Sequence, residues 1–332
     1  MLKQDTCKLM MSTPFESIAW EWLSSIQASV KESTLEHYRY TLSRYILPVL
    51  GALPIHQINE SVLEDGLREI ICPAHHDHRS LGMSMAKECL VLVRRICRFA
   101  AHKKLVPPMQ IEICLPRKSD NTTQPLTEKE CEIVQRYILQ KPSPRKIGLL
   151  LCLQMGLRIG EVCGLQWGDF NLEQGTLFVR RTVKRIYFAS RSTKVIVQTP
   201  KTASSKRKLP IPGNLLEILK QIRGTASNRT WFLSGKKSKP VEPRSFRKSI
   251  HLYLEQAGVH SVHPHMLRHS FATICLQAGC DIKTLSELMG HSSADITMKR
   301  YVHTNWTRMK SEMNRIFGLR RIGSLHPNIL HE

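Results

Sequence analysis

A polar stretch over residues 104–124 contains several prolines and divides the chain into two parts with different residue patterns. Prolines fix the backbone and remove hydrogen-bond donors, so this stretch favours a linker over a helix or a strand. With 332 residues in all, each part is long enough to build a hydrophobic core of its own. We therefore predict a first domain, a linker, a second domain and a C-terminal tail over residues 1–104, 105–124, 125–318 and 319–332.

The first part has apolar residues at helical spacing throughout. Ser33 and Glu36 have the spacing of a capping box, which marks the start of a helix. Pro48 and Gly51 are expected to end that helix. The pattern predicts a small bundle of helices over residues 15–30, 33–46, 59–71 and 84–102.

The second part opens with another capping box, formed by Thr127 and Glu130. Residues 175–211 are rich in β-branched side chains that alternate with polar ones, which predicts a small antiparallel sheet. Helical spacing surrounds this sheet on both sides in the sequence. The fold class is therefore α+β and mostly α, with a helical bundle followed by a mixed α/β domain. The helices expected in the second domain cover residues 128–140, 145–155, 159–166, 213–222, 243–257, 264–278, 281–289, 293–302 and 305–317.

Basic residues outnumber acidic ones by 49 to 27, which gives a formal net charge of +22. An excess of this size indicates a polyanionic partner, and nucleic acid is the obvious one. Ten of the basic residues fall between Arg180 and Lys208, where there is no Asp or Glu. Some basic residues in a segment like this can protect an edge strand from pairing with other chains, but ten of them without one acid are more than that protection needs. We therefore predict that this segment contacts DNA phosphates. The candidate DNA contacts are Arg180, Arg181, Lys184, Arg185, Lys206 and Arg207.

Several other classes of protein are excluded by the sequence. A membrane span needs about 20 apolar residues, and the longest apolar run, over residues 147–153, is far shorter. The first residues have no apolar core followed by a cleavage site, so we expect no signal peptide.

The ten cysteines are scattered, which predicts reduced thiols rather than disulfides or a zinc site. The histidines of residues 75–78 are interpreted as a solvated loop. We expect a cytoplasmic protein without a cofactor or metal, associated with the nucleoid when it binds DNA.

Four motifs in the second part place polar residues where a helix pattern favours apolar ones. Alone, each has an ordinary structural interpretation; Arg158, for example, has Glu161 three residues later as an ion-pair partner. The motifs are GLRIGEVCGLQW from Gly156, TPKTASSKRKLPI from Thr199, HPHMLRHSFAT from His263 and LMGHSSADITMKRYVH from Leu288. Together and in this order they resemble the tyrosine recombinase (phage integrase) family over about residues 125–317. Residues 13–103 resemble, less closely, the SAM-like helical core-binding domain of that family.

The resemblance implies an enzyme that cuts and rejoins DNA at specific sites. The six active-site positions of the family fall on Arg158, Lys201, His265, Arg268, His291 and Tyr301. Glu161 matches the acidic position that supports the first arginine, and His269 matches a structural or supporting position.

These residue types suit attack on a phosphodiester. Two guanidiniums neutralise the phosphate in the transition state, so no metal ion is required. Tyr301 is the expected nucleophile and His265 the candidate base, while His291 donates a further hydrogen bond to the phosphate. Lys201 is the expected acid, which protonates the departing 5′ oxygen. The product is a 3′-phosphotyrosyl link that conserves the bond energy, so rejoining needs no ATP.

The resemblance also implies an assembly. Two domains would close around duplex DNA, and a protein that is monomeric in solution would form a homotetramer on two recombination sites. The helix over residues 305–317 would then dock on a neighbouring protomer, although it suits packing on its own domain as well. An excisionase or a DNA-bending protein would be an accessory partner.

The biological role has several alternatives. We expect an integrase of a mobile element, because the motif details resemble such integrases and little chain precedes the first domain for an arm-binding domain. The alternatives are a Xer-like chromosome or plasmid resolvase, a type IB topoisomerase, and a non-catalytic DNA-binding regulator on the same scaffold.

Overall fold

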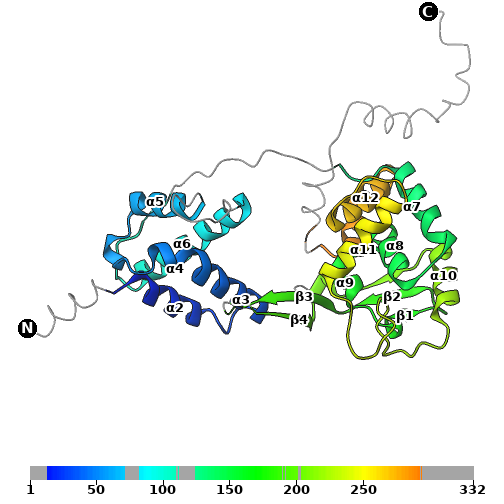
Figure 1. Ribbon diagram of the computed structural model, residues 1–332, viewed down its shortest axis with the longest axis horizontal. Helices are drawn as coiled ribbons and strands as arrows, with labels where there is room; N and C mark the ends of the chain where they lie inside the picture. The colour runs from blue at the N-terminus through cyan, green and yellow to red at the C-terminus, as the bar shows by residue number, and fades with distance from the viewer. Residues whose placement is uncertain are drawn as a thin grey trace, which may run out of the picture. The chain divides into compact units, whose positions relative to one another are not determined.

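The computed structural model describes residues 13–71, 82–109, 111, 124–188, 190, 192–200, 203–291 and 293. The chain divides into two units, which we describe separately (Figure 1). The first consists of Met1–Thr123 and Val183–Val197, and the second consists of Gln124–Thr182 and Gln198–Glu332. None of the helices in these described ranges is long and apolar enough to cross a membrane.

The first unit is a bundle of helices around one apolar core. Its helical segments are α2 (Phe15–Ser25), α3 (Glu32–Thr41), η1 (Leu42–Ile46), α4 (Leu47–Leu50), η2 (Ile55–Gln57), α5 (Glu60–Ile71) and α6 (Met83–His102). Leu42, Ile46 and Leu50 are fully buried, as are Leu63 of α5 and Leu92 of α6. The helical spacing in the sequence thus matches the side chains that form this core.

Two local predictions in this unit are wrong. Helix α3 begins at Glu32 after Lys31, so Ser33 is not its cap. Pro48 does not end the helical path, because α4 continues directly from the π-helix η1 with Pro48 in its first turn, whereas Gly51 does end it as the C-cap of α4.

The basic segment contributes strands to both units. Strands β3 (Thr182–Tyr187) and β4 (Thr193–Gln198) form a two-stranded sheet, most of which groups with the first unit. Strands β1 (Phe170–Asn171), β2 (Thr176–Val179) and β5 (Arg207–Pro210) form a three-stranded antiparallel sheet in the second unit. In its register Leu177 lies opposite Leu209, and both are buried. The predicted small antiparallel sheet is therefore present as two sheets.

The second unit packs its helices around α8, as Figure 1 shows. Its helices are α7 (Glu128–Gln140), α8 (Pro144–Met155), α9 (Ile159–Cys163), η3 (Trp167–Asp169), α10 (Gly213–Arg223), η4 (Ala203–Ser205), α11 (Pro243–Gln256), α12 (Pro264–Gln277) and α13 (Ile282–Met289). Helix α8 contacts α7, α9, α11 and α12. A Cβ atom at Gly148 would lie 2.6 Å from Leu233 and 2.8 Å from Phe246, so a residue without a side chain permits this close packing.

The capping box of Thr127 and Glu130 is confirmed at the start of α7. The α+β, mostly α fold class is confirmed as well. The helices expected over residues 293–302 and 305–317 lie outside the described residues, apart from Ser293.

Candidate active site

Arg158 is held at a turn between two helices of the second unit. Helix α8 ends at Gly156, which has a φ of 61° in the left-handed region that glycine adopts without strain. The chain then turns so that Arg158 is the N-cap residue of α9. Its backbone N–H donates to Oε2 of Glu161 at 3.0 Å, and its Nη1 donates to Oε1 at 2.8 Å. One carboxylate therefore fixes both the backbone and the guanidinium of Arg158.

Arg268 lies in α12, which packs against α8, and it is 4% exposed. Its Nη1 donates to the carbonyl of Gly156 at 2.5 Å, and its Nη2 donates to the carbonyl of Met289 at 2.5 Å. A buried guanidinium needs partners for its donors, and here backbone carbonyls of two other helix ends supply them.

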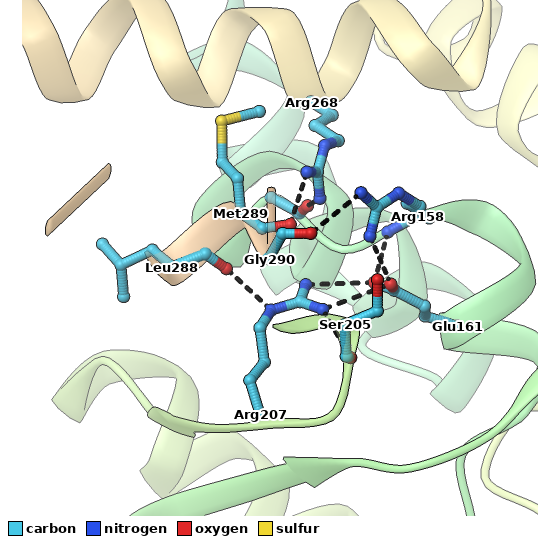
Figure 2. A network of polar contacts seen from close by, with 9 residues as sticks. Arg158, Glu161, Ser205, Arg207, Arg268, Leu288, Met289 and Gly290 are labelled. Carbon is cyan, nitrogen blue, oxygen red and sulfur yellow. Dashed lines mark hydrogen bonds and ion pairs between the residues drawn. The ribbon is translucent and has the colours of Figure 1, made fainter. Parts of the chain in front are cut away.

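The end of α13 brings the two arginines together, as Figure 2 shows. Nη2 of Arg158 donates to the carbonyl of Gly290 at 3.2 Å, next to the Met289 carbonyl that holds Arg268. Gly290 has a φ of 63°, and a Cβ there would lie 2.9 Å from the carbonyl oxygen of Ser204. Glycine is thus required both by the backbone conformation and by the space.

Three of the motif histidines are candidate site residues, and all three lie in the described part of the second unit. His265 is exposed in the first turn of α12, one turn before Arg268, and His269 of the same helix is partly exposed. His291 follows Gly290 directly, and its backbone N–H donates to the carbonyl of Ser286 at 3.1 Å. The other two motif residues, Lys201 and Tyr301, lie outside the described residues.

The candidate DNA contacts have different surroundings. Arg180 and Arg181 both pair with Asp169, whose side chain is buried. Lys184 and Arg185 are partly exposed on β3, and Lys206 is exposed just before β5.

Arg207 differs from that surface set, because it is only 8% exposed. Its Nη1 and Nη2 donate to the two carboxylate oxygens of Glu161 at 3.2 and 3.0 Å. The DNA contact of Arg207 therefore stays a prediction, and the structure shows its guanidinium paired with Glu161. The strand pattern contained the signal: Arg207 alternates with Lys208 and shares its side of β5 with the buried Leu209.

Glu161 is the centre of the polar network in Figure 2. It is 2% exposed, and burial alone would raise its pKa. The guanidiniums of Arg207 and Arg158 outweigh that effect and hold the pKa of Glu161 below its ordinary value. The carboxylate is therefore charged at neutral pH, which keeps both guanidiniums in place.

The site offers guanidinium and imidazole groups rather than a ligand set for a metal ion. Within the described part of the chain, no cluster of three or more His, Cys, Asp or Glu side chains is positioned to hold a metal. Its two guanidiniums, fixed by backbone carbonyls, are groups of the kind that bind anions such as phosphate.

Comparison with known proteins agrees with this geometry. The model of the phage integrase family matches residues 124–308, and the model of the phage integrase central domain matches residues 15–107. A tyrosine recombinase XerC-like protein of Caldanaerobacter subterraneus subsp. tengcongensis is 29% identical over 219 residues, which is 60% of this chain and 54% of that protein. The chain spans about half the length of the curated relatives that it matches first.

Two solved structures share the fold. A Tn1549 transposon integrase in complex with circular intermediate DNA has a TM-score of 0.71 at 19% identity, covering 90% of this chain and 99% of that one. A lambda integrase tetramer bound to a Holliday junction has a TM-score of 0.62 at 17% identity, covering 91% and 82%. Because the family model matches more than half of the sequence, this chain belongs to the phage integrase family.

Proposed function

We propose that the protein is a site-specific DNA recombinase that cleaves and rejoins DNA strands through a 3′-phosphotyrosyl intermediate. The observation that carries this proposal is the convergence of Arg158 and Arg268 on the adjacent carbonyls of Met289 and Gly290. The pair of guanidiniums matches the oxygens of a phosphodiester.

The fixed guanidiniums would act by stabilising charge. Attack on a DNA phosphate adds negative charge to its non-bridging oxygens, and donors already in position pay no reorganisation cost at that moment. Arg158 keeps a third of its side chain exposed, so a phosphate reaches it from solvent. His291 follows Gly290 directly, and the family resemblance assigns it a further hydrogen bond to the same phosphate.

The covalent step is assigned by the family resemblance. The Tyr301 oxygen forms a bond to phosphorus while the bond from phosphorus to the 5′ oxygen breaks. His265 accepts the proton of the tyrosine, and Lys201 gives a proton to the departing 5′ oxygen. Attack by the 5′ hydroxyl of a second strand reverses these transfers and releases the tyrosine, so the step is balanced without ATP.

A suicide substrate tests this proposal. A pool of duplexes with randomised sequence carries a nick close to the cleavage position, so that a short fragment diffuses away after attack and the covalent complex accumulates. We expect the wild-type protein to form a covalent complex that resists denaturation, and sequencing of the captured DNA gives the site. Tyr301→Phe removes the nucleophilic oxygen, so it should retain DNA binding and form no complex. Trapping by the phenylalanine variant would contradict the assignment of the nucleophile.

We further propose that four protomers act on two sites and that the biological role is integration and excision of a mobile element. The lambda integrase tetramer shares the fold, and the motif details resemble mobile-element integrases. The XerC-like name of a relative favours a resolvase as the second candidate. Once the site is known, joining of a circular DNA to a separate target supports the integrase. Conversion of a plasmid dimer to monomers, without joining to a separate target, supports the resolvase.

The exposed cations of the basic segment are proposed to hold the duplex. Lys184, Arg185 and Lys206 retain exposed side chains, whereas the charges of Arg180 and Arg181 are partly offset by Asp169. Removing one cation that contacts a phosphate makes the plot of log affinity against log salt concentration less steep by about 0.9. Lys206→Gln should show that decrease if its side chain contacts the backbone of the duplex.

A further inference from the structure

Arg207 is buried, although every other described cation between residues 180 and 208 is at least partly exposed. We propose that Arg207 is a positioning residue of the active site: it holds the carboxylate that orients Arg158 and the helix end that leads to His291. The inference rests on the proposed recombinase function. It assigns Arg207 a role in cleavage rather than in DNA affinity.

The first line of support is the shared carboxylate. Glu161 Oε1 accepts from Nη1 of Arg158 at 2.8 Å and from Nη1 of Arg207 at 3.2 Å. Its Oε2 accepts from the backbone N–H of Arg158 and from Nη2 of Arg207, both at 3.0 Å. The carboxylate thus lies between the two guanidiniums. If Arg207 no longer holds it, the carboxylate keeps only its contacts with Arg158 and loses the guanidinium on its other side.

The second line is a contact with the opposite side of the site. Nε of Arg207 donates to the carbonyl of Leu288 at 2.8 Å. Leu288 precedes Met289 and Gly290, whose carbonyls hold Arg268 and Arg158. One guanidinium therefore links the carboxylate of α9 to the last turn of α13, and Figure 2 shows both contacts.

The third line is packing against the turn itself. A Cβ atom at Gly290 would lie 2.9 Å from Nη1 and 3.1 Å from Cδ of Arg207. The guanidinium and the turn are thus in direct contact, without an intervening layer of side chains. A displacement of Arg207 is passed to Gly290 and to the neighbouring His291. A displacement of about 1 Å at a catalytic group is enough to slow a reaction by about a hundredfold.

A direct phosphate contact is the competing explanation, and it makes different predictions. The side chain of Arg207 is 7% exposed, and Glu161 already offsets its charge. Lysine neutralises a phosphate as a point charge, so a phosphate contact would survive Arg207→Lys. Lysine has no planar fork, so it cannot hold both carboxylate oxygens and the Leu288 carbonyl together. The conservative variant therefore separates the two roles.

The experiment compares wild type, Arg207→Lys, Arg207→Gln and a control, Lys220→Ala. Lys220 is half-exposed on α10 and pairs with Glu217 of the same helix. The nicked substrate captured by the wild-type protein is used at saturating concentration, so that the rate of covalent complex formation is independent of affinity. DNA affinity is measured separately as a function of salt, and thermal melting shows the temperature range in which each variant is folded.

We expect Arg207→Lys to fold, to bind DNA within about twofold of wild type, and to form the covalent complex at least about tenfold more slowly. Arg207→Gln should be slower still, with an unchanged salt slope, and Lys220→Ala should match the wild type in rate. Cleavage by Arg207→Lys at the wild-type rate would overturn the inference, even if the variant melts earlier, because the residue would then be merely structural. A salt slope lowered by about 0.9 in Arg207→Gln would overturn it in favour of a phosphate contact.

If Arg207→Gln does not fold, the rate for Arg207→Lys decides alone. If the wild-type protein forms no covalent complex, the proposed function fails. That outcome is distinct from a failure of the inference on Arg207, which concerns the ratio of the rates of covalent complex formation in two active proteins.

Discussion

Glu161→Gln should destabilise the second unit strongly, because it removes the charge shared by two guanidiniums. The side chain of Glu161 is 3% exposed and that of Arg207 is 7% exposed, so water does not replace the lost charge. The amide keeps one acceptor but turns the other into a donor, opposite guanidiniums that only donate. The variant leaves the Arg207 guanidinium buried without an opposite charge.

The size of the effect follows from that unpaired charge. Removing one partner of a buried ion pair costs about 3–5 kcal/mol. In a domain of about 150–250 residues, each kcal/mol lowers the melting temperature by about 2–4 °C. We therefore expect the transition of the second unit in Glu161→Gln to lie about 6–20 °C below that of the wild type.

Scanning calorimetry at neutral pH measures this shift, with Glu217→Gln as the matched control. Glu217 has the same charge and an ion pair with Lys220, but its side chain is 65% exposed. An exposed pair contributes little, so the control should melt close to the wild type. Equal melting temperatures for the two variants would refute the reasoning. Adding Arg207→Met to Glu161→Gln should recover part of the loss, because no buried charge then remains unpaired.

Acid should weaken the second unit through the same carboxylate. The pKa of Glu161 is lowered in the folded state, so its contribution is complete above its unfolded pKa of about 4.3 and is lost as the pH falls through the folded pKa. Melting temperature against pH should therefore be flatter in Glu161→Gln than in wild type. Thr127→Ala removes the cap of α7 and should lower the free energy of unfolding by about 1 kcal/mol in urea titrations, whereas Thr127→Ser should keep it. Burial raises the pKa of Cys152 to about 12, so iodoacetamide should label this thiol only after unfolding, as mass spectrometry of the peptide would show.

Short sequence motifs predicted the start of a helix correctly where all the hydrogen-bonding groups lie within one helical turn. The Thr127 hydroxyl and the Glu130 carboxylate each meet the other's backbone N–H, so the sequence alone defines this cap. The same signal failed at Ser33, because the Glu36 carboxylate pairs with Arg39 instead. Glu36 is also mostly buried in the fold, and helix spacing does not reveal that environment.

The candidate site depends on contacts that no local pattern contains. Motifs identified Arg158 and Arg268, but Arg268 meets the Gly156 carbonyl across 112 residues of sequence. Arg158 meets the Gly290 carbonyl across 132 residues. The charge count grouped Arg207 with the exposed cations, whereas its side chain lies on the buried side of β5. Strand alternation and charge must therefore be considered together in such segments.

The charges in the network explain why a buried acid belongs in the proposed phosphate site. Arg158, Arg207 and Arg268 carry three positive charges and Glu161 carries one negative charge, so two positive charges remain. A phosphodiester has one negative charge, and attack by an oxygen nucleophile adds a second as the transition state forms. Under the proposed function, this fixed positive charge interacts more strongly with the transition state than with the bound phosphodiester, which lowers the barrier rather than only tightening binding. Without Glu161, the guanidiniums of Arg158 and Arg207 would lose the carboxylate that fixes their orientation.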